Sequence, residues 1–470
     1  MSSPLARQHP PVEAIQFNYR LCASLHNKIF QLGWVASGRT FESCPSQTYW
    51  EHYSPLVEIA DQINIDLVQF LKRAYSHAEA PEFFYFLKSL THPRLLLDDE
   101  WFEDRGKDRF ILLYPATGFK MGDEMGLIFD QQTCKVAFIE DFEDITPIVD
   151  NGYGWKPLED VLSAYLEMIE EGKIEVATPD RKWTRKSPSD SFGPWLFHHY
   201  TAADVQKSAQ AFKRLLNAIK DRVLSLPTDS SNKKQDRAGS TLPWAESSTL
   251  DTAQIHTNTF TRAFCEETAK YDREVPFQYI APGIRLPTAD EFIAQPFLGK
   301  SWLKHPLGAE MPVLLFRADD PTLASNNTIP TSGTWLRYDG DKGVPIPGGL
   351  YVNGDGQMNT AFENGCRFLL PFTLGSHGWA RLSDGEVMGM KPWDDEPVPA
   401  EVNCDLYQTG YNGFLGPRCV QIHKVLLNWA ERVESGDWEV TENGVRGGIE
   451  TFREADTEHG WQKYVLPLTW

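Results

Sequence analysis

Long apolar runs are missing from this sequence. Nowhere do about 18 apolar residues follow one another, which is the length that a membrane-spanning helix requires. The N-terminal stretch MSSPLARQHPPVEAIQF also lacks the apolar core of a signal peptide. We therefore expect a cytoplasmic protein with no membrane partner.

Cysteines are few and show no pairing pattern. The chain has seven, an odd number, widely scattered and without a C-x-x-C pair. A disulfide framework or a structural zinc site needs several cysteines at close, regular spacing. The pattern predicts buried, reduced thiols.

The common catalytic signatures are also missing. The sequence contains no GxxxxGK[ST], no GxGxxG after a strand, no HExxH, no GxSxG and no EF-hand loop. These absences argue against the usual nucleotide hydrolases, dinucleotide-dependent oxidoreductases, zinc proteases and α/β-hydrolases. No cofactor is evident from the sequence.

Positive charge is in deficit, whereas apolar and aromatic residues are plentiful. A net charge of -20 repels phosphate backbones and argues against nonspecific nucleic-acid binding. With 41% apolar residues and 15 tryptophans among 470 residues, the chain can bury a large core. Its length predicts two or three domains.

Several elements follow from periodicity. A helix with one apolar stripe is expected over 157–172, another from Thr201 to Val223, and a β-hairpin over 126–139. Thr288 and Glu291 form a predicted capping box. Helices are also expected over 49–75 and from Pro81 through a cluster of phenylalanines.

The composition divides the chain into three parts. Residues 225–250 are polar, carry both charge signs and predict a flexible linker. Residues 1–224 should form an N-terminal α+β domain, and 251–470 a C-terminal α+β domain that is rich in β-structure between 312 and 416. The expected fold class is α+β, with a sheet and a packed amphipathic helix in each domain.

A possible internal duplication accompanies this division. The helix stripe of the first half recurs 264 residues later in IHKVLLNWAERVESGDWEV. Identities continue beyond the stripe at Glu170 and Glu434, at Gly172 and Gly436, and in a following Glu-Val. Two related domains would explain the pattern, and so would the general similarity of core helices that end in glycine.

One resemblance rests on this repeated segment. LLNWAERVESGDW (426–438) resembles the closing helix of the SUKH superfamily, in which a strand pair precedes a helix of the type FLxxFAxxLExGxW. GLIFDQQTCKVAFI, before the helix of the first half, has a similar order. The superfamily includes fungal cell-wall-assembly regulators, and the resemblance implies a non-catalytic binding or regulatory module.

A second resemblance is one of overall character. The long, aromatic-rich chain is similar to fungal enzymes of specialised metabolism, among them the arginine-containing cyclodipeptide synthases. That resemblance implies an acyl or aminoacyl transferase that joins amino acids from aminoacyl-tRNA into a cyclic dipeptide. It identifies no catalytic residue in this sequence.

Acidic residues are concentrated in LLLDDEWFEDRGKDR. Asp98, Asp99 and Glu103 follow three leucines and are predicted to face a cleft, where they would bind a guanidinium, an ammonium group or Mg²⁺. Glu140 and Asp141 could border the same cleft. The alternative is a solvated loop in which the carboxylates pair with Arg105, Lys107 and Arg109.

A glycine-rich, aromatic segment offers the second candidate site. GSHGWARL places His377 and Trp379 among glycines that let a backbone approach a ligand closely. A small-molecule pocket is one interpretation, and an ordinary turn of a β-rich domain is the other. The first functional hypothesis is therefore a biosynthetic transferase, and the second an interaction protein whose acidic surface binds a basic partner protein.

Overall fold

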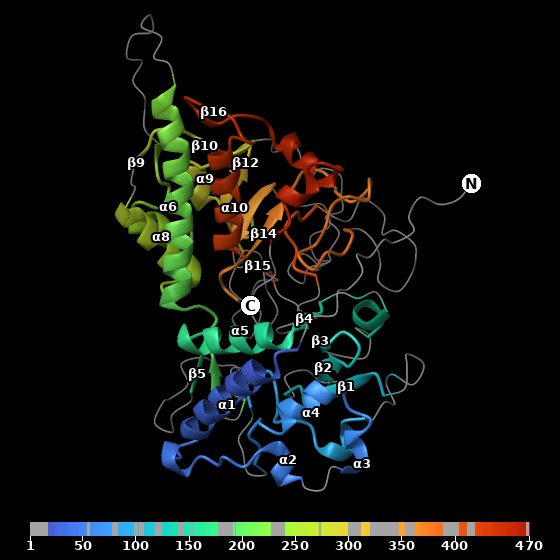
Figure 1. The fold of residues 1–470 in the computed structure, drawn as a ribbon. Coiled ribbons are helices and arrows are strands. Elements are labelled where there is room, and N and C mark those ends of the chain that lie inside the picture. Colours follow the sequence, from blue (N-terminus) through green and yellow to red (C-terminus); the bar gives the residue numbers. More distant parts are fainter. Residues whose placement is uncertain are drawn as a thin grey trace, which may run out of the picture. The chain divides into compact units, whose positions relative to one another are not determined.

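A computed structural model describes most of the chain. The described residues are 17–53, 57–77, 83–97, 102, 108–117, 125–139, 145–150, 152, 154–176, 191–192, 194–226, 240–271, 274–298, 312–319, 347–352, 362–388, 404–410, 419–466 and 470. Contacts between residues divide the chain into two units, one built mainly from residues 1–198 and the other from 199–410 and 417–468. Both contain helices and sheets (Figure 1), which confirms the α+β class.

The first unit contains helices α1 to α5 and strands β1 to β7. Its helices are α1 (Tyr19–Ala36), α2 (Tyr49–His52), α3 (Val57–Ala60), α4 (Ile65–Leu71) and α5 (Leu158–Glu170). Its strands are β1 (Phe110–Pro115), β2 (Gly126–Asp130), β3 (Lys135–Ile139), β4 (Lys156–Pro157), β5 (Ile174–Val176), β6 (Ser191–Phe192) and β7 (Trp195–Phe197). Strands β1 to β4 pair antiparallel in chain order, and β5, β7 and β6 form a second sheet.

A β-bulge bends the first strand pair of this unit. The register between β1 and β2 shifts between Leu112 and Tyr114, and Gly126 lies opposite Pro115 with a φ of 135°. A Cβ at Gly126 would lie 2.1 Å from the Tyr114 carbonyl oxygen. Only glycine allows this approach.

Helices α1 and α5 pack against each other (Figure 1). Helix α5 carries the predicted apolar stripe. From α1, His26 is buried and lies parallel to Phe83 with ring centroids 4.6 Å apart. Its Nε2 donates to the Tyr75 carbonyl oxygen at 2.9 Å, so its Nδ1 accepts the Tyr114 hydroxyl at 2.7 Å. His26 therefore joins α1 to β1 as a neutral imidazole.

The second unit contains helices α6 to α10 and strands β8 to β17. Its helices are α6 (Ala202–Ser225), α7 (Ser247–Thr252), α8 (Phe260–Tyr271), α9 (Ala289–Ile293) and α10 (Ile422–Ser435). Its strands are β8 (Ser240–Thr241), β9 (Glu274–Val275), β10 (Tyr279–Ala281), β11 (Ile284–Arg285), β12 (Val313–Ala318), β13 (Gly349–Val352), β14 (Gly365–Leu369), β15 (Val420–Gln421), β16 (Val440–Thr441) and β17 (Gly444–Val445). Eight of them form one sheet in the order β15-β14-β13-β12-β11-β10-β17-β16.

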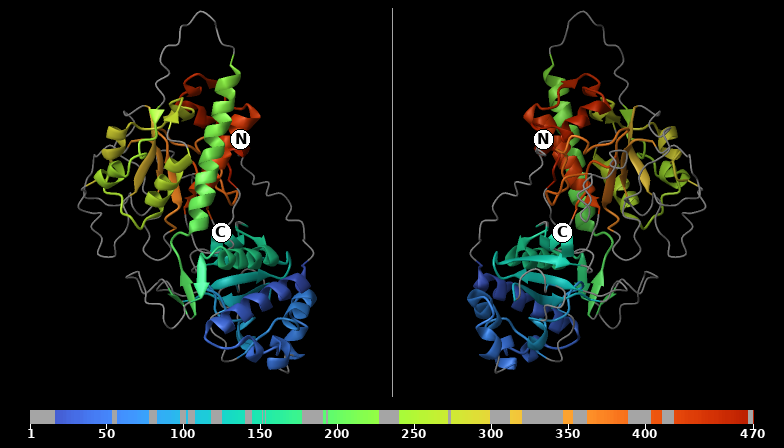
Figure 2. Two further views of the ribbon diagram at one scale, coloured as in Figure 1. Left: turned by 90° about the vertical axis from the view of Figure 1, so that its left-hand side faces the viewer. Right: turned by 90° about the vertical axis from the view of Figure 1, so that its right-hand side faces the viewer.

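The sheet of the second unit presents an aromatic row to its helices. Phe316, Leu350 and Phe368 are cross-strand neighbours on β12, β13 and β14, and all three are buried. Phe212 of α6 stacks on Phe316 at 5.5 Å, and Trp429 of α10 meets the edge of Phe368 at 5.3 Å. Helices α6 and α10 lie side by side in Figure 1 and in both turned views of Figure 2.

Three helices of this unit begin at one buried dipeptide, Glu363-Asn364. The Glu363 carboxylate accepts the Phe260 N–H at the start of α8 at 2.8 Å, and the Asn364 carbonyl accepts the Ile422 N–H at the start of α10 at 2.9 Å. The Asn364 amide donates to Asp204 at 3.2 Å. Asp204 completes the capping box of α6. The dipeptide therefore accepts N–H groups at the starts of α8 and α10 and binds the capping carboxylate of α6.

The structure differs from the expected domain boundaries in two places. The predicted first domain ran to residue 224, whereas α6 belongs to the second unit because it packs on α8 and α10. Residues 240–250, the end of the predicted flexible linker, are folded. Trp244 is 1% exposed and donates its indole N–H to Thr268 at 2.9 Å, so this part of the linker prediction is corrected. Residues 227–239 lie outside the described residues.

Other expectations can be compared element by element. The hairpin is confirmed as β2 and β3, and the capping box at Thr288 is confirmed. The predicted helix 49–75 is replaced by α2, α3 and α4. The predicted helix after Pro81 is wrong for the described residues, where Phe84 and Leu87 pair their backbones across a turn.

The buried His26 predicts a pH dependence of stability. Burial lowers its pKa from 6.5 to about 4. The unfolded chain therefore takes up this proton first as the pH falls, and the contribution of His26 is complete above about 6.5 and lost progressively toward 4. The loss amounts to at most about 3 kcal/mol. Urea unfolding from pH 7 to pH 4.5 should show a shallower decline for His26→Asn, and equal slopes would contradict the neutral assignment.

The bulges predict a strong requirement for glycine at two positions. A Cβ at Gly349 would lie 2.2 Å from the Phe316 carbonyl oxygen, whereas Gly436, also at positive φ, has nothing within 4 Å. Gly436→Ala should cost about 1 kcal/mol of backbone strain. Gly349→Ala and Gly126→Ala should each cost at least about 2 kcal/mol more, because the backbone must also move. Urea unfolding measures the difference, and similar costs at all three glycines would refute the close approach.

Candidate functional site

The carboxylates predicted to bind a cation lie outside the described residues. This holds for Asp98, Asp99, Glu103, Glu140 and Asp141. A cationic ligand or Mg²⁺ at these side chains therefore stays a prediction. Arg109, which the alternative paired with the first acidic run, binds Asp130 through two hydrogen bonds of 2.9 Å.

The other two predicted residues, His377 and Trp379, lie on a loop that surrounds Asp456. The Asp456 carboxylate is 3% exposed and accepts four backbone N–H groups. The donors and their distances are Gly375 at 2.9 Å, His377 at 2.9 Å, Trp379 at 2.9 Å and Ala380 at 3.0 Å. The imidazole of His377 adds a fifth contact through Nδ1, at 3.2 Å.

The glycines of this loop let its backbone approach a side chain of the same protein, Asp456. Gly375 and Gly378 have φ values of 95° and 76°, which turn successive N–H groups toward Asp456. Burial raises the pKa of Asp456, but the N–H donors outweigh it and hold that pKa below its usual value. The anion that the loop encloses is therefore the Asp456 carboxylate of the same chain.

His377 is the exposed part of this arrangement. Its side chain is 76% exposed, and its Nδ1 lies 3.2 Å from the Asp456 carboxylate. Trp379 contributes its backbone to the same carboxylate. The predicted pair is therefore brought together around Asp456, in an arrangement that positions one imidazole.

Two arginines near the loop lie over aromatic rings. The Arg381 guanidinium lies 5.3 Å from the centroid of Trp461, and that of Arg453 lies 3.8 Å from the centroid of Phe372. Arg381 also donates to the Gly378 carbonyl at 2.8 Å. Each of these cation–π contacts contributes about 0.5–1 kcal/mol at an exposed site.

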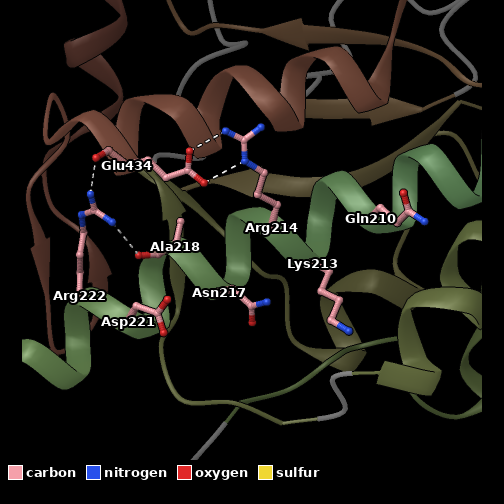
Figure 3. Close-up of a pocket in the computed structure, with 8 residues that line it drawn as sticks. All are labelled: Gln210, Lys213, Arg214, Asn217, Ala218, Asp221, Arg222 and Glu434. Carbon is pink, nitrogen blue, oxygen red and sulfur yellow. Dashed lines mark hydrogen bonds and ion pairs between the residues drawn. The ribbon is translucent and has the colours of Figure 1, made fainter.

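A second candidate, which the sequence analysis did not identify, is a shallow groove on the outer face of α6 (Figure 3). It is open to solvent and has a volume of about 390 Å³. We call it the α6 groove. It is lined by Gln210, Lys213, Arg214, Asn217, Ala218, Asp221 and Arg222 of α6 and by Glu434 of α10.

Two arginines of the α6 groove are fixed by α10. Arg214 binds Glu434 through two hydrogen bonds, 2.8 Å from Nε and 2.6 Å from Nη2. Arg222 donates to the Glu434 carbonyl at 2.5 Å and to the Ala218 carbonyl at 3.3 Å. The Arg214 hydrogen bonds lower the pKa of Glu434. Figure 3 shows Glu434 between the two guanidinium groups.

The charge of this face differs from that of the chain. The partly or fully exposed charged residues of α6 are the cations Lys207, Lys213, Arg214, Lys220 and Arg222 and the anion Asp221. This is a basic helix face in a protein of net charge -20. These residues can be located in the sequence, but the net charge of the whole chain does not reveal the local positive charge of this helix.

Metal and membrane sites were also sought in the described part of the chain. Among the described residues, no group of three or more His, Cys, Asp or Glu side chains could hold a metal ion. Within the same residues, the structure contains no helix that is long and apolar enough to cross a membrane.

Comparison with known proteins adds no relative. The chain matches no protein-family model, no curated protein and no solved structure.

The loop around Asp456 makes a prediction about its own rigidity. Asp456→Asn turns an amide NH₂ toward backbone donors and leaves buried N–H groups without acceptors, which should cost about 3 kcal/mol. Amide exchange over residues 374–382, followed by mass spectrometry, should accelerate markedly. Glu458→Gln is the matched control, because Glu458 is exposed on the same segment. Unchanged exchange in Asp456→Asn would show that the carboxylate does not organise the loop.

Proposed function

We propose that the chain is an interaction protein built from two related α+β modules. The proposal is supported by one observation, which is that buried and ion-paired residues of similar type recur at corresponding places in the strand and helix order of the two units. Its functional content comes from the SUKH resemblance, whose members are mostly binding and immunity modules.

The strands carry the first part of this support. In each unit four antiparallel strands pair in chain order, and the last leads directly into a helix: β1 to β4 into α5, and β12 to β15 into α10. The first pair is bulged in both, between Leu112 and Tyr114 and between Leu314 and Phe316. A glycine of positive φ begins the next strand in both.

The buried cross-strand row is repeated as well. Tyr114, Leu127 and Phe138 are register partners in the first unit. Phe316, Leu350 and Phe368 occupy the corresponding places in the second. Both rows read aromatic, leucine, aromatic, and each is contacted by the first long helix of its unit, through His26 in one case and Phe212 in the other.

The helices carry the second part of the support. Glu170 and Glu434, the exposed identities at the 264-residue offset, both pair with a cation on that first helix. Lys28 of α1 lies 2.8 Å from Glu170, and Arg214 of α6 lies 2.6 Å from Glu434. Gly172 and Gly436 follow α5 and α10 with φ values of 70° and 82°. A shared ion pair explains identities that an amphipathic pattern alone does not require.

An open, charged surface fits this function better than it fits catalysis. The α6 groove is shallow and its polar groups are spread along a helix face rather than converging on one point. Such surfaces are typical of protein recognition.

One experiment separates this proposal from the biosynthetic hypothesis. The full chain is expressed in a bacterial host, and the medium is searched by mass spectrometry for cyclic dipeptides. The same tagged chain is purified from its own cells, with crosslinking to identify partners. We expect a reproducible partner at near-equal stoichiometry and no new dipeptide. New cyclic dipeptides that disappear without the chain would establish the transferase and overturn the proposal.

A further inference from the structure

We propose that the α6 groove binds a short, extended, acidic peptide segment of a partner protein. This inference rests on the proposed function and names the chemistry of the partner. The net charge alone suggested a basic partner, but the α6 face has the opposite sign.

Charge complementarity is the first argument. Lys213 and Lys220 are exposed on α6, and Lys213 is held over the Tyr271 ring at 4.9 Å from its centroid. Their ammonium groups can receive carboxylates at little desolvation cost, since both remain hydrated. Arg222 adds a cation at one end of the groove. Within the groove the cations Lys213, Arg214 and Arg222 outnumber the anions Asp221 and Glu434 by one, so the groove favours an anionic segment over a cationic one.

The spacing of the polar groups is the second argument. Gln210, Arg214, Asn217 and Asp221 recur at three or four residues, so they share one face of α6. Gln210 and Asn217 lie about 10 Å apart along a helix, which matches about three residues of extended chain. Their amides can pair with the backbone of a peptide while its acidic side chains reach Lys213.

The carboxylates within the groove argue for a peptide rather than a nucleic acid. Glu434 already pairs with Arg214, and Asp221 also lines the groove. Each would repel a continuous phosphate backbone, as would the net charge of -20. A peptide can place neutral residues opposite Asp221 and acidic residues opposite Lys213.

Binding of a defined probe tests the inference. A short fluorescein-labelled peptide of alternating glutamate and serine is titrated with the full chain at low salt, and anisotropy is recorded. We expect saturable binding that weakens as salt is added. Lys213→Glu should weaken it at least about tenfold, and Lys213→Gln less, because reversal adds repulsion to the lost attraction.

The controls distinguish the groove from general electrostatics. Arg446→Glu makes the same change in net charge at a cation of the same unit that is 69% exposed and outside the groove. It should bind the peptide within about twofold of the wild type. Equal weakening in Arg446→Glu and Lys213→Glu would overturn the inference, as would the absence of saturable binding. Tighter binding of a single-stranded RNA of equal charge would overturn it too.

The outcome also separates this inference from the proposed function. If Lys213→Glu retains its partner in crosslinking and peptide binding is unchanged, the groove is not the docking site, although the interaction function stands. New cyclic dipeptides would remove the interaction function itself. Circular dichroism of Lys213→Glu and Lys213→Gln establishes that both variants are folded before binding is compared.

Discussion

The second unit depends on how the starts of its helices are satisfied. Helices α6, α8 and α10 all begin at Glu363-Asn364. The Glu363 carboxylate accepts a backbone N–H of α8, the Asn364 carbonyl accepts one of α10, and the Asn364 amide donates to the capping carboxylate of α6. A buried helix start without such partners is costly, since its first N–H groups have no acceptor within the helix. The dipeptide therefore sets where α6 and α10 begin on the sheet. Their side-by-side packing, and hence the groove with its paired arginine, follows from that placement.

The two units have similar packing arrangements. In each, a bulged antiparallel meander turns an aromatic–leucine–aromatic row toward two helices, and an ion pair at the solvent edge sets the helices in register. Exposed ion pairs of this kind add little stability. Their value lies in alignment: the bidentate Arg214–Glu434 pair fixes a direction, whereas Lys28 offers Glu170 a single point charge.

The success of sequence reasoning followed the range of the interactions concerned. Helix α5, the hairpin β2–β3 and the capping box at Thr288 depend on neighbours within a few residues, and all were predictable. The helix 49–75 failed at Asn64, whose side chain caps a new helix start at Asp66 and Leu67. Between 240 and 250, a polar composition hid the buried residues Leu242, Trp244 and Leu250. The role of Gly375 and Gly378 depends on Asp456, which is remote in sequence, and no local pattern reveals it. The apolar stripe of α6 predicts only its buried face, and the groove on its exposed face depends on Glu434 of α10, which is remote in sequence.

The Glu363-Asn364 junction also bears on the chemical ageing of the chain. Asn364 precedes Gly365, a dipeptide in which an asparagine side chain can cyclise onto the next backbone nitrogen and hydrolyse to aspartate or isoaspartate. In the folded protein Asn364 is fully buried at the start of β14, which restrains that cyclisation. After a period of unfolding the amide would be lost irreversibly, and a third carboxylate would stand beside Glu363 and Asp204 with one hydrogen-bond donor fewer. Only unfolding that lasts long enough for cyclisation converts Asn364, so the lifetime of the second unit depends on how rarely and how briefly this junction opens, as well as on its equilibrium stability.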